Sequence, residues 1–105
     1  MAEAGDDYFF QGEFSGNTAT LGRCGLQIIA EGKNHFRGIL LPGGLPGDGW
    51  NHAQRIEFVG VRGASKLHLT AGANSIDVGV GVAVLRDATG RQQGVLRRTV
   101  RTMIG

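Results

Sequence analysis

Apolar and polar residues alternate with a period of two along most of this chain, and this pattern constrains its fold more than any other feature. Successive side chains of a β-strand point to opposite faces, so the alternation predicts strands with one face in a core. The alternating segments are short, and none has apolar residues at helical spacing. We therefore expect an all-β fold of about seven or eight antiparallel strands. Either a single-domain β-sandwich or a partly closed β-roll would accommodate them.

Turn signals and the phase of the alternation assign an inward face to each expected strand. Hairpin turns are expected at Gly32-Lys33-Asn34, before a strand over His35 to Leu41, and at Thr89-Gly90. The outward side chains include Gln11 and Glu13, Gln27 and Glu31, Arg55 and Glu57, and Lys66 and His68. The expected inward side chains are Tyr8, Phe10, Phe14, Leu26, Ile28, Ala30, Phe36, Leu40, Ile56, Phe58, Leu67, Leu69, Leu96 and Val100.

A run of apolar residues at every second position predicts one further, longer strand. Ile76, Val78, Val80, Val82 and Val84 would form a valine stripe on one face, opposite Gly79 and Gly81. Such a stripe would be a flat surface on which another sheet could lie, which favours a structural or self-associating module and a homo-oligomer. Glycines expected inside strands, which mark bulges or close backbone crossings, are Gly12, Gly38, Gly79 and Gly81.

The size and charge of the chain indicate one domain and give no sign of nucleic acid binding. A chain of 105 residues and 11.1 kDa can bury one core, so we expect a single domain over residues 1–105, with 1–7 flexible and 102–105 beginning a linker or tail. The formal charge of +2 is too small to predict a nucleic acid partner.

The charges are unevenly placed along the chain. The beginning is acidic and the end is basic, which suggests that the two ends lie close together or that one end meets a partner. A solvated, basic edge strand explains the same pattern. The residues concerned are Glu3, Asp6, Asp7 and Glu13 at the beginning, and Arg86, Arg91, Arg97, Arg98 and Arg101 at the end.

Cysteine content and hydropathy exclude several other classes. Cys24 is the only cysteine, so it forms no internal disulfide and is expected as a small buried group in or beside a strand. No apolar stretch approaches the ~20 residues of a membrane span. The segment Met1 to Asp7 lacks the basic and apolar regions of a secretory signal, so we expect a soluble chain, with any signal already removed.

The segment from Gly43 to Trp50 is the most distinctive local feature. Its glycines and one proline predict a tight, specified turn just before the only tryptophan. The indole of Trp50 could stack on a sugar ring or fill a pocket of a partner, but it could also be a core side chain beneath the loop. The residues expected to shape the loop are Gly43, Gly44, Pro46, Gly47 and Gly49, and those expected to add hydrogen bonds near Trp50 are Asp48, Asn51, His52 and Arg37.

Catalytic and metal sites have little support in the sequence. Glycoside hydrolysis usually needs two carboxylates roughly 5–9.5 Å apart, and Asp48 with Glu57 is the one pair to consider. Alternatively, Asp48 caps the turn and Glu57 pairs with Arg55, with Arg37 or with solvent. The histidines His35, His52 and His68 lack metal-ligand spacing, and no helix follows the glycine-rich loop to bind phosphate. We expect no cofactor and no metal.

Several segments together resemble a known family. They resemble the N-terminal region that precedes the catalytic domain in some bacterial 3-keto-disaccharide hydrolase proteins, over about Gln11 to Arg101. The glycine-proline-tryptophan segment is the distinctive part of this resemblance. The matching segments are Gly25-Leu26-Gln27, Ala30 with Gly32, Phe36-Arg37, Pro42-Gly43-Gly44-Leu45-Pro46-Gly47 with Gly49-Trp50, Arg55-Ile56-Glu57, and Leu96-Arg97-Arg98 to Arg101.

The resemblance implies an accessory role. In those proteins the glycosidic chemistry belongs to a second, concanavalin-like domain, so this chain is expected to recognise carbohydrate or to dock on a carbohydrate-active domain. It also implies a periplasmic or secreted protein. The chain ends at Gly105 without a Ser-Pro linker, which predicts a free-standing relative or a truncated product, and no catalytic residue can be carried over.

The tryptophan offers the first test. If Trp50 contacts sugar, its intrinsic fluorescence will shift when soluble oligosaccharides are titrated, because stacking changes the polarity around the indole. Trp50→Ala will abolish sugar binding measured by calorimetry while leaving the unfolding midpoint near that of the wild type. A silent titration across a broad glycan panel would contradict the stacking hypothesis.

Overall fold

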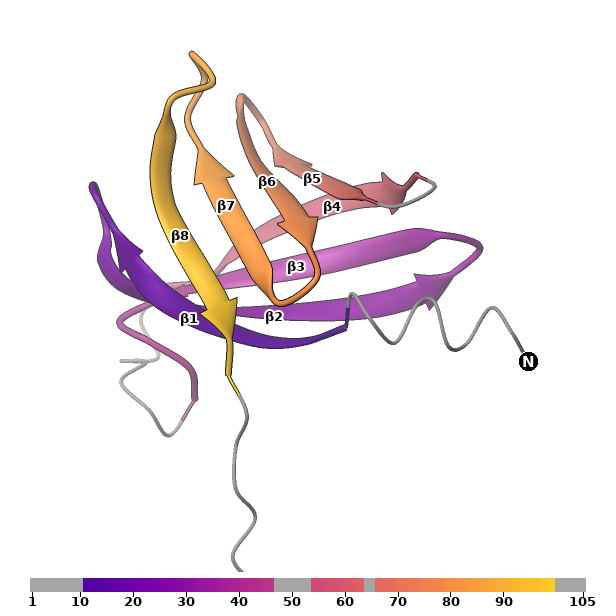
Figure 1. Cartoon of the computed structure of the whole chain (residues 1–105), viewed down its shortest axis with the longest axis horizontal. Helices are drawn as coiled ribbons and strands as arrows, with labels where there is room; N and C mark the ends of the chain where they lie inside the picture. The colour runs from indigo at the N-terminus through magenta and orange to yellow at the C-terminus, as the bar shows by residue number, and fades with distance from the viewer. Residues whose placement is uncertain (1–10, 47–53, 64–65, 100–105) are drawn as a thin grey trace, which may run out of the picture.

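A computed structural model describes residues 11–46, 54–63 and 66–99, and these residues form an eight-stranded antiparallel barrel without helices (Figure 1). Each strand pairs with the next, and the last pairs with the first. The strands are β1 (Gly12–Thr18), β2 (Gly22–Gly32), β3 (His35–Pro42), β4 (Ile56–Arg62), β5 (Leu67–Ala71), β6 (Asn74–Gly79), β7 (Val82–Arg86) and β8 (Gln92–Arg98). The all-β, antiparallel prediction is confirmed, but the predicted sandwich is wrong because the sheet closes on itself.

The barrel closes through the pairing of β1 with β8. The register runs from Phe14 opposite Arg98 to Thr18 opposite Gly94. A hydrogen bond of 2.8 Å from Thr99 N to Glu13 O continues the contact beyond the ladder. The expectation that the two ends of the chain lie close together is therefore confirmed for the first and last strands. The basic edge strand is wrong, because β8 has a hydrogen-bonded neighbour on each side.

The interior of the barrel is filled by the alternating apolar side chains. An eight-stranded barrel is just wide enough for side chains to fill it, so these residues form one packed core. Cys24 is buried as expected, and its burial raises the pKa of the thiol. The buried cluster comprises Phe14, Cys24, Leu26, Ile28, Phe36, Leu40, Phe58, Leu67, Leu69, Ile76, Val78, Ala83, Leu85 and Leu96, with Ala30, Ile56 and Ala71 packed against it. Tyr8, Phe10 and Val100 lie outside the described residues, as do 1–7 and 102–105.

The hairpin turn between β2 and β3 lies where the sequence predicts it. Gly32 pairs with His35, which leaves Lys33 and Asn34 as the loop. Both loop residues have left-handed backbone angles, with φ of 53° and 66°. Two left-handed central residues are typical of the type I′ turn, whose twist matches that of the flanking strands.

The predicted valine stripe is wrong. A turn at Val80 and Gly81 separates β6 from β7, and the Val80 side chain is 79% exposed. Gly81 has a φ of 76°, a left-handed conformation that glycine adopts without strain. Beyond the turn the inward side chains are Ala83 and Leu85, so the phase of the alternation has changed. The flat surface expected to support self-association is therefore absent from these two strands.

The segment from Gly43 to Trp50 is described as far as Pro46, and we call Gly43 to Pro46 the glycine-proline corner. Its backbone conformation is closely constrained. Gly43 and Gly44 have φ values of 102° and 135°, and Gly43 N donates a 2.7 Å hydrogen bond to Arg23 O. Leu45 is fully buried against Gly25, where an added Cβ would lie 2.6 Å from Leu45 N. Because Gly25 faces away from the core, the corner folds back onto the outer surface of the barrel. Gly47 and Gly49 lie outside the described residues.

Close approach of β4 and β5 generates a stability prediction. A Cβ on Gly60 would lie 2.0 Å from the backbone oxygen of His68, so Gly60→Ala must push the two strands apart. We expect a loss of about 1–3 kcal/mol in the free energy of unfolding, measured by urea denaturation. Gly79→Ala is the control, since its nearest neighbour is a side-chain atom of Val82 at 3.7 Å. Equal stability of the two variants would contradict the packing described.

Candidate functional site

Most of the residues predicted to bind a ligand around the tryptophan lie outside the described part of the chain. Asp48, Trp50, Asn51 and His52 lie outside the described residues, so the binding roles expected of them stay predictions. Arg37 lies on the outer face of β3, and its guanidinium forms an ion pair of 3.1 Å with Glu31. It therefore points away from the interior of the barrel.

Glu57 also belongs to the outer surface. Its carboxylate lies 3.6 Å from Arg37 Nη1 and 3.3 Å from Arg55 Nη2. The interpretation that Glu57 pairs with these arginines is confirmed. A catalytic pair of Glu57 with Asp48 stays a prediction, because Asp48 is not among the described residues.

A pocket of about 310 Å³ lies at one end of the barrel. The β5–β6 and β7–β8 turns stand at this end, at the top of the view in Figure 1. Mouths of β-barrels are common positions for small-molecule sites, and clefts of roughly this size hold small ligands. We call it the mouth pocket; it is lined by Thr20, Leu21, Leu40, Ile56, Phe58, Asn74, Leu85, Arg86, Asp87 and Gln93.

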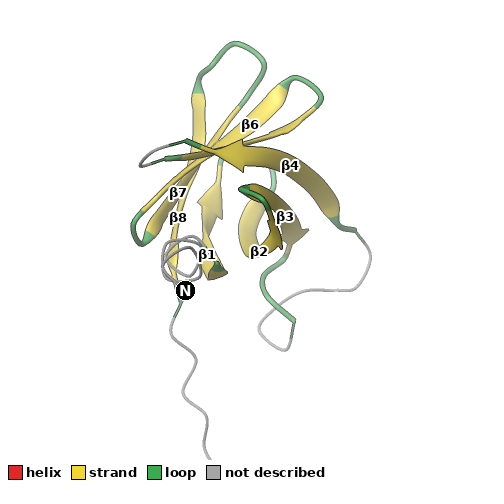
Figure 2. Cartoon of the chain, turned by 90° about the vertical axis from the view of Figure 1, so that its right-hand side faces the viewer, coloured by secondary structure: helices red, strands yellow, loops and turns green. Residues whose placement is uncertain are grey.

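The mouth pocket reaches the apolar core because the barrel is incompletely paired there. The first residues of β4 pair with β3 alone, and pairing of β4 with β5 begins only at Val59 opposite Thr70. Leu40, Phe58 and Leu85 are core side chains that lie beneath this opening. Figure 2 shows the barrel from the side, with β4 diverging from the strands that follow it.

The rim of the pocket is held by hydrogen bonds between its turns. Ala19 N, in the β1–β2 turn, donates a 2.7 Å bond to Gln93 O of β8. The side-chain amide of Gln93 donates in turn to Asp87 Oδ2 at 2.8 Å. These bonds join the β1–β2 turn, β8 and the β7–β8 turn into one fixed edge. A rim fixed in advance loses little conformational entropy when a ligand binds.

The Asp87 carboxylate accepts several hydrogen bonds at this rim. Its Oδ1 accepts hydrogen bonds from the hydroxyl of Thr89 at 2.7 Å, from Thr89 N at 2.9 Å and from Arg91 N at 3.0 Å. The bond from the Thr89 hydroxyl is the chief cause of the lowered pKa of Asp87, and the bonds from the two backbone amides and from Gln93 also lower it. Asp87 is therefore a negatively charged acceptor at neutral pH.

Two other rim residues have side chains available to a ligand. Asn74, at the start of β6, and Thr20, in the β1–β2 turn, are exposed and line the pocket. Neither side chain hydrogen-bonds to another residue in the described part of the chain. Asn74 offers both a donor and an acceptor, and Thr20 offers a hydroxyl.

Arg86 connects the rim to the outer face of β5 and β6. Its Nε donates a 3.0 Å hydrogen bond to Asp77 Oδ2, and its Nη1 donates to Gly90 O at 3.3 Å. The other oxygen of Asp77 lies 2.6 Å from His68 Nδ1. The hydrogen bond with His68, followed by the interactions with Arg86, lowers the pKa of Asp77. Arg86 is thus anchored outside the barrel rather than extended into the pocket.

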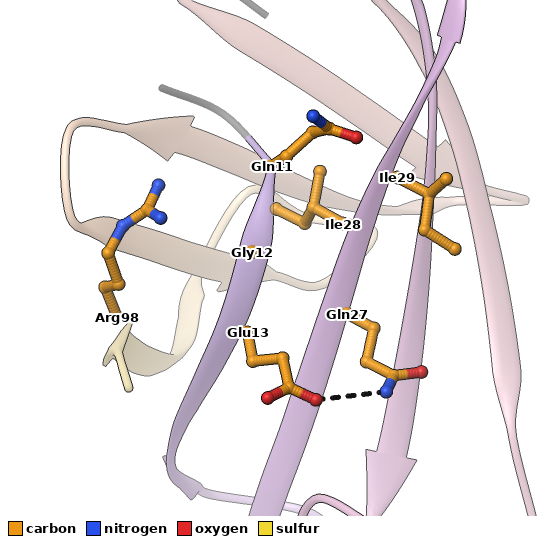
Figure 3. Close-up of a pocket in the computed structure, with 7 residues that line it drawn as sticks. All are labelled: Gln11, Gly12, Glu13, Gln27, Ile28, Ile29 and Arg98. Carbon is orange, nitrogen blue, oxygen red and sulfur yellow. Dashed lines mark hydrogen bonds between the residues drawn. The ribbon is translucent and has the colours of Figure 1, made fainter. Parts of the chain in front are cut away.

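A second hollow, of about 440 Å³, lies near the opposite end of the barrel (Figure 3). It is shallow and open, and it runs along β1 and β2 beside the end of β8. Gln27 Nε2 donates to Glu13 Oε2 at 3.2 Å along one side. The Arg98 guanidinium, on the other side, lies 5.2 Å from the centre of the Phe14 ring. Ile28 and Ile29 are its large apolar lining residues, fewer than those that line the mouth pocket.

The described residues bring together no metal site and no membrane-spanning helix. Nowhere in residues 11–46, 54–63 and 66–99 do three His, Cys, Asp or Glu side chains gather as metal ligands. In the same ranges, no helix is long and apolar enough to cross a membrane. Comparisons of the chain with family models, with curated proteins and with solved structures found no match.

The sequence did not single out the mouth pocket. Its lining comes from distant segments that meet only when the barrel closes, so no local motif contains them. The one local signal was the turn at Asp87 to Gly90, where an Asp side chain bonds the backbone amide two residues on. That signal predicts a shaped turn but not a pocket beside it.

The lowered pKa of Asp77 predicts a pH dependence of stability. A carboxylate with a lowered pKa stabilises the fold above its ordinary pKa of about 3.9, and the contribution is lost as the pH falls through the lowered value. Because the side chains involved are partly exposed, Asp77→Asn should cost at most about 1 kcal/mol at pH 7. Urea denaturation between pH 2 and pH 7 measures the difference, which should shrink below about pH 4. A difference that is constant over this range would contradict the role assigned to the ionised carboxylate.

Proposed function

We propose that this chain is a non-catalytic recognition domain that binds carbohydrate in the mouth pocket. The observation that carries the proposal is the pairing of an apolar floor with a polar rim fixed in advance, at the end of a closed barrel. The accessory role beside a 3-keto-disaccharide hydrolase-type glycosidase, and a periplasmic or secreted location, rest on the sequence resemblance.

The chemistry of the rim suits a sugar. A sugar ring has hydroxyl groups that need hydrogen-bond partners, and its C–H groups tolerate an apolar lining such as that of this pocket. Asp87 Oδ2 accepts one hydrogen bond from Gln93 and has a second lone pair for a sugar hydroxyl, and the Asn74 amide both donates and accepts hydrogen bonds. Charge-assisted hydrogen bonds from hydroxyls to a carboxylate are stronger than neutral ones. The rim therefore provides specificity and the floor provides apolar contact.

The same geometry favours recognition over hydrolysis. Cleavage of a glycosidic bond usually needs two carboxylates across the sugar, one of them protonated by virtue of a raised pKa. Among the described lining residues, Asp87 is the one carboxylate, and its pKa is lowered. Glu57 points to the outer face, where two arginines hold it. A hydrolytic pair inside the mouth pocket is therefore disfavoured within the described part of the chain.

Calorimetry with matched asparagine variants tests the proposal. The probes are glucose-containing disaccharides and their 3-keto forms. Asn74→Ala should weaken binding by about ten-fold, because the loss of one hydrogen bond at a ligand costs about 1–1.5 kcal/mol. Asn17→Ala is the control, since Asn17 is an exposed residue of β1 outside the mouth pocket. Equal affinities of the two variants, or no heat of binding from any sugar, would contradict the proposal.

A further inference from the structure

The mouth pocket becomes less polar with depth. Its deepest lining residues, Leu40 and Phe58, are core side chains that are each 1% exposed, and Leu85 lies beside them at 5%. Ile56 and Leu21 continue the apolar lining toward solvent. No polar side chain among the described lining residues comes from this lower part of the pocket.

The polar lining residues belong to the turns and strand ends at the rim. Thr20 lies in the β1–β2 turn, Asn74 begins β6, and Asp87 follows β7. The side chain of Gln93 is held by Asp87, and that of Arg86 is held by Asp77. Hydrogen-bonding capacity is thus confined to the outer edge of the pocket.

A bare sugar does not match this gradient. A sugar ring has hydroxyls around its whole edge, and pushing it to the floor would bury some of them without partners, at a cost of about 1–3 kcal/mol each. An apolar group has no such cost at the floor. The ligand that matches the pocket is therefore apolar at one end and hydroxylated at the other.

The volume of the pocket limits the size of the apolar end and of the hydroxylated end of such a ligand. A cavity of ~150 Å³ lined by Leu, Ile and Phe takes up benzene, and the mouth pocket measures about 310 Å³. It has room for one group of benzene size on the floor and for a sugar ring at the rim. Resting on the proposed function, we infer that the ligand is a glycoside with a small apolar aglycone, which enters the barrel aglycone first.

Three soluble probes separate the parts of this inference: phenyl β-glucoside, methyl β-glucoside and phenol. Phenyl β-glucoside should bind at least about ten-fold more tightly than methyl β-glucoside, since each buried methylene-sized group is worth about four-fold in affinity. Phenol alone should bind at least about ten-fold more weakly than phenyl β-glucoside, because it lacks the hydroxyls that the rim bonds. Calorimetry on the whole chain gives all three affinities.

A matched pair of variants locates the aglycone. Leu21→Ala should weaken the binding of phenyl β-glucoside about five-fold or more and leave methyl β-glucoside nearly unchanged, because Leu21 lines the apolar part of the pocket. Ile29→Ala is the control, since Ile29 is an exposed apolar residue on the outer surface. In the wild-type chain, the methyl NMR resonances of Leu85 and Ile56 should shift on addition of phenyl β-glucoside but not of methyl β-glucoside. This measurement does not depend on the folding of any variant.

The outcomes distinguish the inference from the proposed function. Equal affinities for the phenyl and methyl glucosides overturn the inference and leave carbohydrate recognition standing. Phenol binding as tightly as its glucoside overturns carbohydrate recognition and shows an apolar site alone. Absence of binding by every probe overturns both. Tight binding of the phenyl glucoside that Leu21→Ala weakens and Ile29→Ala spares supports both.

Discussion

The pairing of β1 with β8 is the constraint on which the rest of the structure depends. It closes the described strands into one sheet, directs one face of every strand into a single interior, and places β1 beside β8. Close backbone contact makes the closure tight, since a Cβ on Gly16 would lie 2.3 Å from Val95 O. Closure also gathers the turns at one end of the barrel into a rim, and the mouth pocket exists only as a result.

The features that the sequence predicted well are local ones. Alternation placed Leu26, Phe36, Phe58 and Leu69 in the core because neighbouring side chains of a strand must point to opposite faces. The β6–β7 hairpin was missed because residues 82–85 are all apolar, so both phases of the alternation matched. The turn at Val80-Gly81 sets the phase of the alternation, and it was not recognised because it lies among valines.

Closure and the candidate site could not be predicted for a different reason. Pairing between the first and last strands joins residues about eighty positions apart, and no local pattern specifies it. Of the residues predicted to bind a ligand, the structure describes Arg37, which lies on the outer face with Glu31 and Glu57. The residues that do converge, such as Asn74, Asp87 and Gln93, have ordinary turn and strand signals in the sequence.

Backbone NMR of the whole chain tests the central claim, barrel closure, most directly. Nuclear Overhauser contacts should connect Phe14 with Arg98, Gly16 with Leu96 and Thr18 with Gly94, and the amides that join these strands should exchange slowly with solvent. Absence of these contacts, with fast exchange along the facing edges of β1 and β8, would show an open sheet. It would remove both the closed barrel and the mouth pocket that depends on it.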